Sequence, residues 1–126
     1  MQDSVLKKES FLTVTDLSAL QFTCVAMSAA NTVASNTSDT TPTVGILYNN
    51  PKGTSTSPKE AEVAVSGIAK VLAGGAITQG AIVVPTSGGA VIVTTTTKKF
   101  AVGIALDAAD NGDLVRVKLG TFQTNF

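Results

Sequence analysis

Histidine is absent from the sequence, and cysteine occurs once. Without histidine the commonest general base and metal ligand is missing, so Ser-His, Cys-His and His-zinc centres are excluded. Cys24 cannot form a disulfide within the chain, and its apolar neighbours predict a buried strand residue. The formal net charge is zero and no basic stripe occurs, so we expect no nucleic-acid partner.

Long apolar runs are also missing. No stretch reaches the length that crosses a membrane, and we expect no membrane partner. The first ten residues, MQDSVLKKES, have no apolar run after their positive charges. This predicts that the chain carries no secretory signal and is synthesised in a cytoplasm.

Charged residues are scarce, at 14% of the chain against about 25% in ordinary soluble domains. Much of the outer surface must therefore be uncharged. Such a surface suits a protein that packs against other copies of itself or against other proteins. The alternative is a merely polar surface rich in threonine.

Motifs that carry chemistry are weak. Ser4 and Lys7 have an S-x-x-K spacing but lack the accompanying pocket motifs, and no phosphate-binding glycine loop occurs. Asp107, Asp110 and Asp113 resemble an oxygen-rich cation loop, but their spacing is not that of an EF-hand and no glutamate closes it. A solvated turn is the better interpretation. We therefore expect no catalytic residue, no cofactor, no metal and no enzymatic activity.

The clearest positive signal is a β-hairpin at residues 99–120. Apolar residues alternate with small ones before the turn and with charged ones after it, namely Val102, Ile104 and Leu106, then Val115, Val117 and Leu119. Alternation of this kind is typical of strands with one buried face. Between the two runs, Asn111-Gly112 can take the positive φ angles of a tight turn.

A degraded copy of this pattern lies about 58 residues earlier. The matches are Gln21 with Gln79, Val25 with Val83, Val33 with Val91, Thr37 with Thr95, and residues 44–46 with 102–104. After a longer loop at 50–59, residues 62–67 align with 115–120. The sequence thus predicts an internal repeat with copies at 18–67 and 76–120.

Strand spacing predicts the fold class. Short strands recur about every ten residues between Gly, Asn and Ser turns, which indicates an all-β fold, a compact barrel or sandwich of two tandem β-modules. A junction at 68–72 links the modules. Residues 1–16, with a short β-like run at 11–15, are expected to form an extended N-terminal arm before a single β-domain at 17–126.

The second half carries a recognisable succession of elements. A Gly-x-Ala/Val-Lys/Arg-Val strand at 67–71 is followed by an A-I-T-x-G-x-x-V turn and strand at 76–83 and a Gly-rich turn at 87–90. The hairpin V-G-I-A-L-x-A-A-x-x-G-D-L-V-x-V-x-L then covers 102–119. This succession resembles a family of small capsid decoration, or cement, proteins of tailed bacteriophages.

The resemblance implies a β-tulip-like protein that sits as a homotrimer on the outer capsid surface of the virion. It would tie neighbouring copies of the major capsid protein together and be made in the host cytoplasm. The arm and the tail at 121–126 are candidates for strand addition to a neighbour, and the exposed Pro-rich loop at 50–59 for partner contacts. The candidate capsid or subunit contacts are Phe11, Leu12, Val14, Pro51, Lys52, Pro58, Phe122 and Phe126.

Other functions stay open at this point. One is another virion role for the same fold, such as a fibre base or a host-surface adhesin, although no shaft repeat occurs. Another is a non-viral β-barrel that acts as a binding or carrier module. A carrier would present a modifiable lysine at a hairpin tip, and neither Asn111-Gly112 nor Gly88-Gly89 does so.

Overall fold

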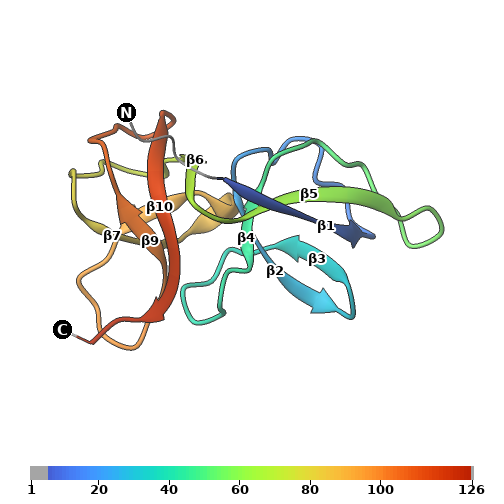
Figure 1. The fold of residues 1–126 in the computed structure, drawn as a ribbon, viewed down its shortest axis with the longest axis horizontal. Helices are drawn as coiled ribbons and strands as arrows, with labels where there is room; N and C mark the ends of the chain where they lie inside the picture. The colour runs from blue at the N-terminus through green and yellow to red at the C-terminus, as the bar shows by residue number, and fades with distance from the viewer. Residues whose placement is uncertain (1–5, 126) are drawn as a thin grey trace.

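Ten β-strands make up the regular structure of residues 6–125, the part of the chain that this computed structural model describes, and they lie in two lobes side by side (Figure 1). The first lobe contains β1 (Lys7–Thr13), β2 (Cys24–Ala29), β3 (Thr32–Ser35), β4 (Gly45–Leu47) and β5 (Lys59–Ser66). The second contains β6 (Ile68–Leu72), β7 (Ile82–Pro85), β8 (Val91–Val93), β9 (Phe100–Ala105) and β10 (Leu114–Gln123), with one 3-10 turn at Ser87–Gly89. The predicted all-β fold is confirmed. No helix in these residues has the length and apolar character needed to cross a membrane.

Both lobes have the same topology. The first is a closed barrel with the strand order β1-β3-β2-β4-β5, in which Leu12 of β1 lies parallel to Thr32 of β3. The second has the order β6-β10-β9-β7-β8, and a parallel bridge between Ala73 and Val91 joins its two edges. Because the first barrel is closed, its order can also be read from β1 through β5, as β1-β5-β4-β2-β3. This order matches β6-β10-β9-β7-β8 strand by strand.

Strand registers show the same duplication. Val25 of β2 lies opposite Gly45 of β4, and 58 positions later Val83 of β7 lies opposite Gly103 of β9. Both glycines are required by close packing, because a Cβ at either position would collide with a backbone carbonyl of the neighbouring strand. The matched glycines therefore mark a shared backbone contact.

The repeat is longer than the sequence comparison indicates. The ranges 18–67 and 76–120 omit β1 and β6, the first strand of each copy. At the other end, Val63 and Val117 occupy equivalent positions beside Leu47 and Ala105, so the alignment of 62–67 with 115–120 is one residue out of register. The reason is Gly120, which does not end its strand: β10 continues to Gln123 through an irregularity after Leu119.

Residues 7–13 form a barrel strand and not a free arm. β1 pairs with β5 along its whole length, from Lys7 opposite Ser66 to Thr13 opposite Lys59. Its sequence, KKESFLT, hides this role because only Phe11 and Thr13 turn toward the barrel interior. The first three residues of the strand are charged, so almost no apolar alternation is left to detect.

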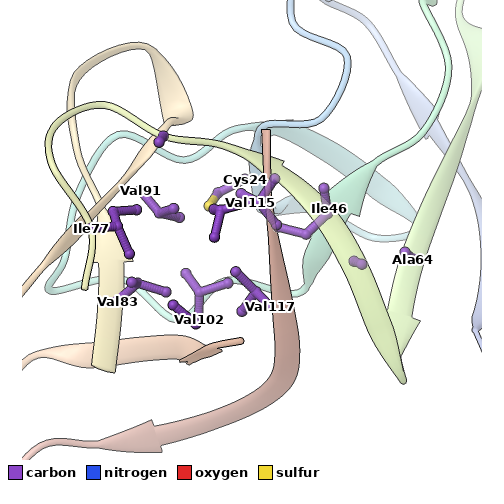
Figure 2. Close-up of a cluster of buried hydrophobic side chains, with 13 residues drawn as sticks. Cys24, Ile46, Ala64, Ile77, Val83, Val91, Val102, Val115 and Val117 are labelled. Carbon is purple, nitrogen blue, oxygen red and sulfur yellow. The ribbon is translucent and has the colours of Figure 1, made fainter. Parts of the chain in front are cut away.

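Each lobe has its own apolar interior, and the two interiors correspond position by position. The first contains Leu17, Val25, Val33, Leu47, Ala61 and Val63. The second contains Ile77, Val83, Val91, Ala105, Val115 and Val117 at the equivalent places. Figure 2 shows that the second cluster also takes in side chains of the first lobe, Cys24, Ile46 and Ala64. The lobes therefore share buried apolar surface, which ties their folding together.

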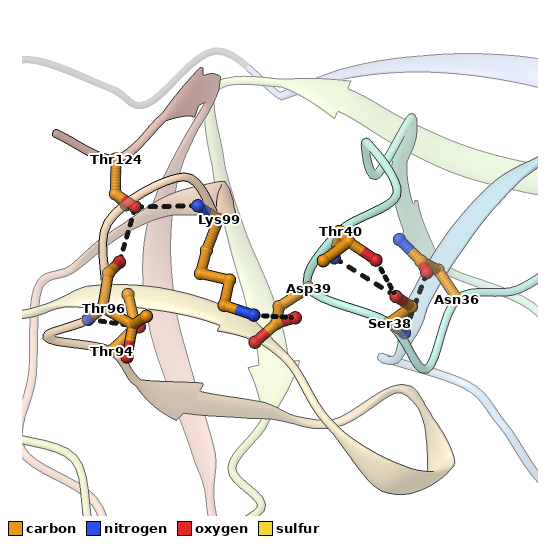
Figure 3. Close-up of polar contacts among 8 residues, drawn as sticks. All are labelled: Asn36, Ser38, Asp39, Thr40, Thr94, Thr96, Lys99 and Thr124. Carbon is orange, nitrogen blue, oxygen red and sulfur yellow. Dashed lines mark hydrogen bonds and ion pairs between the residues drawn. The ribbon is translucent and has the colours of Figure 1, made fainter.

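Hydrogen bonds fix the two lobes against each other. The Leu72 N–H donates to the Phe22 carbonyl at 2.8 Å, and the Lys70 N–H donates to the Tyr48 hydroxyl at 2.7 Å. Tyr48 is itself held within the first lobe, where the Phe22 ring meets it edge to face with centroids 5.3 Å apart. On the other side of the molecule, Lys99 Nζ lies 3.2 Å from the Asp39 carboxylate (Figure 3).

Candidate interaction surface

Two carboxylates of the acidic turn between β9 and β10 accept hydrogen bonds from groups of the same chain. Asp107 accepts two hydrogen bonds from the Arg116 guanidinium, at 2.9 and 2.8 Å, and this partner lowers the pKa of Asp107. Asp113 accepts a bond from the Asp110 N–H at 3.3 Å. Within residues 6–125, no cluster of three or more acidic or thiol side chains is arranged to hold a metal ion.

Cys24 is buried, as its neighbours in the sequence predict. Burial raises the pKa of its thiol to about 12, so the group is protonated at neutral pH. A protonated and inaccessible thiol is a poor nucleophile. Its place is in the packing between the lobes.

Four of the predicted contact residues gather at the outer end of the first lobe. Leu12 is 41% exposed and Val14 is 39% exposed. The loop between β4 and β5 runs beside them, because the backbone of Lys52 forms an isolated antiparallel β-bridge with Asp16, shortly after β1 ends. Pro58 is exposed on the same loop. This end therefore presents apolar side chains next to a lysine.

Part of that loop is not the free excursion expected from its composition. Pro51 is buried and its carbonyl accepts a hydrogen bond from the Leu17 N–H at 2.9 Å. Gly53 is buried against the backbone of Thr13, where no Cβ would fit. Asn50, Lys52 and residues 54–59 are exposed.

The remaining predicted contacts lie elsewhere. Phe11 packs partly buried against the interior of the first lobe. Phe122 is 40% exposed near the C-terminal end of β10, and that end of the strand lies away from the β4–β5 loop (Figure 1). Phe126 lies outside the described residues. The structure therefore does not bring the eight residues together on one surface.

One feature that the sequence did not reveal is an open, mostly apolar hollow between the lobes, of about 490 Å³. It is lined by Ala26, Met27, Thr41, Pro42, Thr43, Val44 and Thr121. Met27 is 46% exposed, and Thr121 closes one side by donating its hydroxyl to the Thr43 carbonyl at 3.2 Å. Because these two threonines are 78 positions apart, no local pattern could predict their contact.

The sequence matches one family model, and the fold matches a solved structure. A family model described as phage cement protein matches residues 31–119, from the start of β3 almost to the end of β10. Among solved structures, the N base of head fiber gp8.5 in bacteriophage phi29 matches with a TM-score of 0.69 and 13% sequence identity, covering 97% of this chain and 100% of that chain. At this identity the likeness shows a common fold. No curated protein sequence matches. Because the family match extends across both lobes, the chain belongs to the phage cement protein family.

Proposed function

We propose that this virion structural protein binds the outer surface of a phage head as a homotrimer and bridges neighbouring copies of the major capsid protein. Membership of the cement family is the observation that carries the proposal. The exposed surface agrees with it, since Leu12, Val14, Met27 and Phe122 leave large apolar side chains in solvent. Covering such side chains with a partner would be favourable.

The distribution of these side chains suits bridging. The β4–β5 loop lies at one end of the molecule, and the C-terminal end of β10, the strand that carries Phe122, lies at the other (Figure 1). A molecule with contacts at both ends can touch two neighbours in a lattice. Trimerisation would multiply these contacts, because each further contact forms at the high effective concentration that the first one creates.

Stabilisation would then follow from linkage. A protein that binds only the assembled shell lowers the free energy of that state and leaves the free subunits unchanged. At a concentration about a hundredfold above the dissociation constant, the gain is about 2.7 kcal/mol per site. No covalent bond is needed.

Purified protein and heads that lack it provide the test. Wild-type protein should bind in copies that are multiples of three and raise the temperature at which heads release DNA. Val14→Asp and Phe122→Asp should each weaken binding by about tenfold, as expected for the loss of an apolar contact. Thr95→Asp, at an exposed position on the β8–β9 connection, is the matched control and should bind like wild type. Heads that survive heating equally well with and without the protein would refute stabilisation.

The likeness to the phi29 head-fiber base favours a second candidate, an attachment base. Such a base would bind the head and hold another protein there without strengthening the shell. The same experiment separates the two candidates. Saturated binding with unchanged thermal survival would support the base.

A further inference from the structure

A row of four residues crosses the outer face of the second lobe. Ile68 of β6, Lys118 of β10, Ile104 of β9 and Ile82 of β7 are neighbours in the strand register. Residues directly opposite in adjacent strands point to the same face. Ile104 is 39% exposed, Lys118 is exposed, and the other two are half-buried.

Three of the four residues in the equivalent row of the first lobe are covered, and the fourth, Lys8, is exposed. The row consists of Lys8 of β1, Ala64 of β5, Ile46 of β4 and Cys24 of β2, paired in the same registers. Ile46, Ala64 and Cys24 have no exposed surface, because the second lobe packs onto them (Figure 2). The same row of strand positions thus occurs in both lobes. In the first lobe it forms an internal interface, and in the second lobe it faces solvent.

The part of the second lobe that covers the first row is known from its contacts. Leu72 and Lys70 of β6 donate their N–H groups to the first lobe. Gly89 packs beside Thr23, where a Cβ would lie 3.0 Å from the threonine Cβ. The covering surface is therefore β6 together with the turn before β8.

In the first lobe the side chains at the same surface are open to solvent, although the Leu12 N–H, which corresponds to the Leu72 donor, already donates to the Asn31 carbonyl at 2.9 Å. Leu12 and Ser10 of β1 stand in the places of Leu72 and Lys70, as the strand registers show. Asn31 stands in the place of Gly89 and shares its positive φ, at 53° against 79°. Leu12 is 41% exposed, and Ser10 and Asn31 are also exposed.

We propose that a second copy of the chain covers the open row: Ile104 and Lys118 of one copy dock against Leu12 and Glu60 of the next, repeating between molecules the lobe-to-lobe contact within each molecule. This inference names the interface for the self-association in the proposed function and rests on it. The contact is head to tail. Contacts of this kind form rings when the rotation between copies closes.

Charge supports this choice of partner. Leu12 lies directly opposite Glu60 in the β1–β5 register, and Ile104 lies directly opposite Lys118 in the β9–β10 register. Neither Glu60 nor Lys118 has an ion pair within residues 6–125. The β1–β5 surface thus has an apolar side chain beside an acid, and the β9–β10 surface has an apolar side chain beside a base. Docking would pair the two apolar side chains with each other and the acid with the base.

The contact between copies should be weaker than the one within a chain. In the first lobe, Phe22 at the edge of the covered row packs against Tyr48, whose hydroxyl accepts the Lys70 N–H of the second lobe. Its counterpart in the second lobe is Gly80, which also has a positive φ but no side chain. Without this aromatic pair, we expect the copies to separate on dilution while each molecule stays folded.

Light scattering on purified protein tests the interface. Wild type should give a closed oligomer, and Ile104→Asp and Leu12→Asp should each be monomeric, with dissociation constants at least about thirtyfold higher, as at interface hot spots. Mixed one to one, the two variants should form a dimer and nothing larger, because each mixed pair has one intact contact. Thr95→Asp is the control and should keep the wild-type mass.

Charge reversal gives an independent check at two exposed positions, where folding should not suffer. Lys118→Glu and Glu60→Lys should each weaken association by about tenfold, and the double variant should restore it. An oligomeric wild type whose variants keep its mass would overturn this interface and leave the self-association in place. A monomeric wild type at high concentration would overturn both. Head binding, measured separately, tests the remainder of the proposed function.

Discussion

Replacing Ile46 by alanine should destabilise the protein far more than the same change at Ile104, although the two residues occupy equivalent strand positions. Ile46 is fully buried between the lobes, whereas Ile104 is 39% exposed. Both changes remove three carbons, worth about 2.4 kcal/mol when fully transferred from water. At Ile46 a cavity also forms, which brings the expected loss to about 3 to 4 kcal/mol. At Ile104 solvent can fill the space, and about 1 to 1.5 kcal/mol should be lost.

Urea unfolding at low protein concentration measures this difference, since dilution keeps the contribution of self-association small. Wild type should unfold in one transition, because the buried cluster extends across both lobes. Ile46→Ala should lower the midpoint sharply, and a second transition would indicate that the lobes then unfold separately. Equal losses at the two positions would refute the view that the first row is an internal interface and the second an open one.

Three further predictions concern backbone packing and titration. Gly45→Ala should cost about 3 kcal/mol or prevent folding, since its Cβ would strike a backbone carbonyl, whereas Gly120→Ala meets nothing within 4 Å and should be tolerated in thermal melts. The pKa of Asp107 lies below its ordinary value of 3.8 because of Arg116, so the stability from this pair is present above pH 3.8 and lost as pH falls below it. Asp107→Asn should flatten that part of the pH profile of the melting temperature. The pKa of Cys24 is raised from 9.0 to about 12, so its contribution is present below pH 9 and lost as pH rises toward 12. A thiol reagent at pH 8 should react only after unfolding, and rapid reaction with the native protein would contradict burial.

The repeat could be predicted where the two copies face the same packing constraint. Val25 and Val83 point into equivalent interiors, and Gly45 and Gly103 approach equivalent carbonyls, so these positions kept the same residue type. β1 could not be predicted as a barrel strand. Its first three residues are charged, and its pairing partner β5 lies about 50 residues away in the sequence.

The exposure of the candidate contact residues could not be predicted from the sequence alone. Phe11 and Leu12 are adjacent in β1, yet one packs against the interior and the other lies in solvent, because side chains alternate along a strand. Without the register the sequence could not separate them. Pro51 looked like an exposed loop residue, but its carbonyl anchors the Leu17 N–H. The hollow beside Met27 depends on a long-range contact that no pattern records.

Differences at two equivalent positions explain why the row in the first lobe is covered by the other lobe and the row in the second lobe is exposed. In the first lobe the row contains Cys24 and Ala64, whose small side chains let a neighbouring sheet approach closely enough to exclude water. In the second lobe the equivalents are Ile82 and Lys118, which are larger, and one of them is charged. An apolar lobe cannot cover Lys118 without leaving a buried charge unpaired, which is costly. A partner that brings an acid next to an apolar side chain would avoid this cost, and the β1–β5 face of the same chain presents that pair.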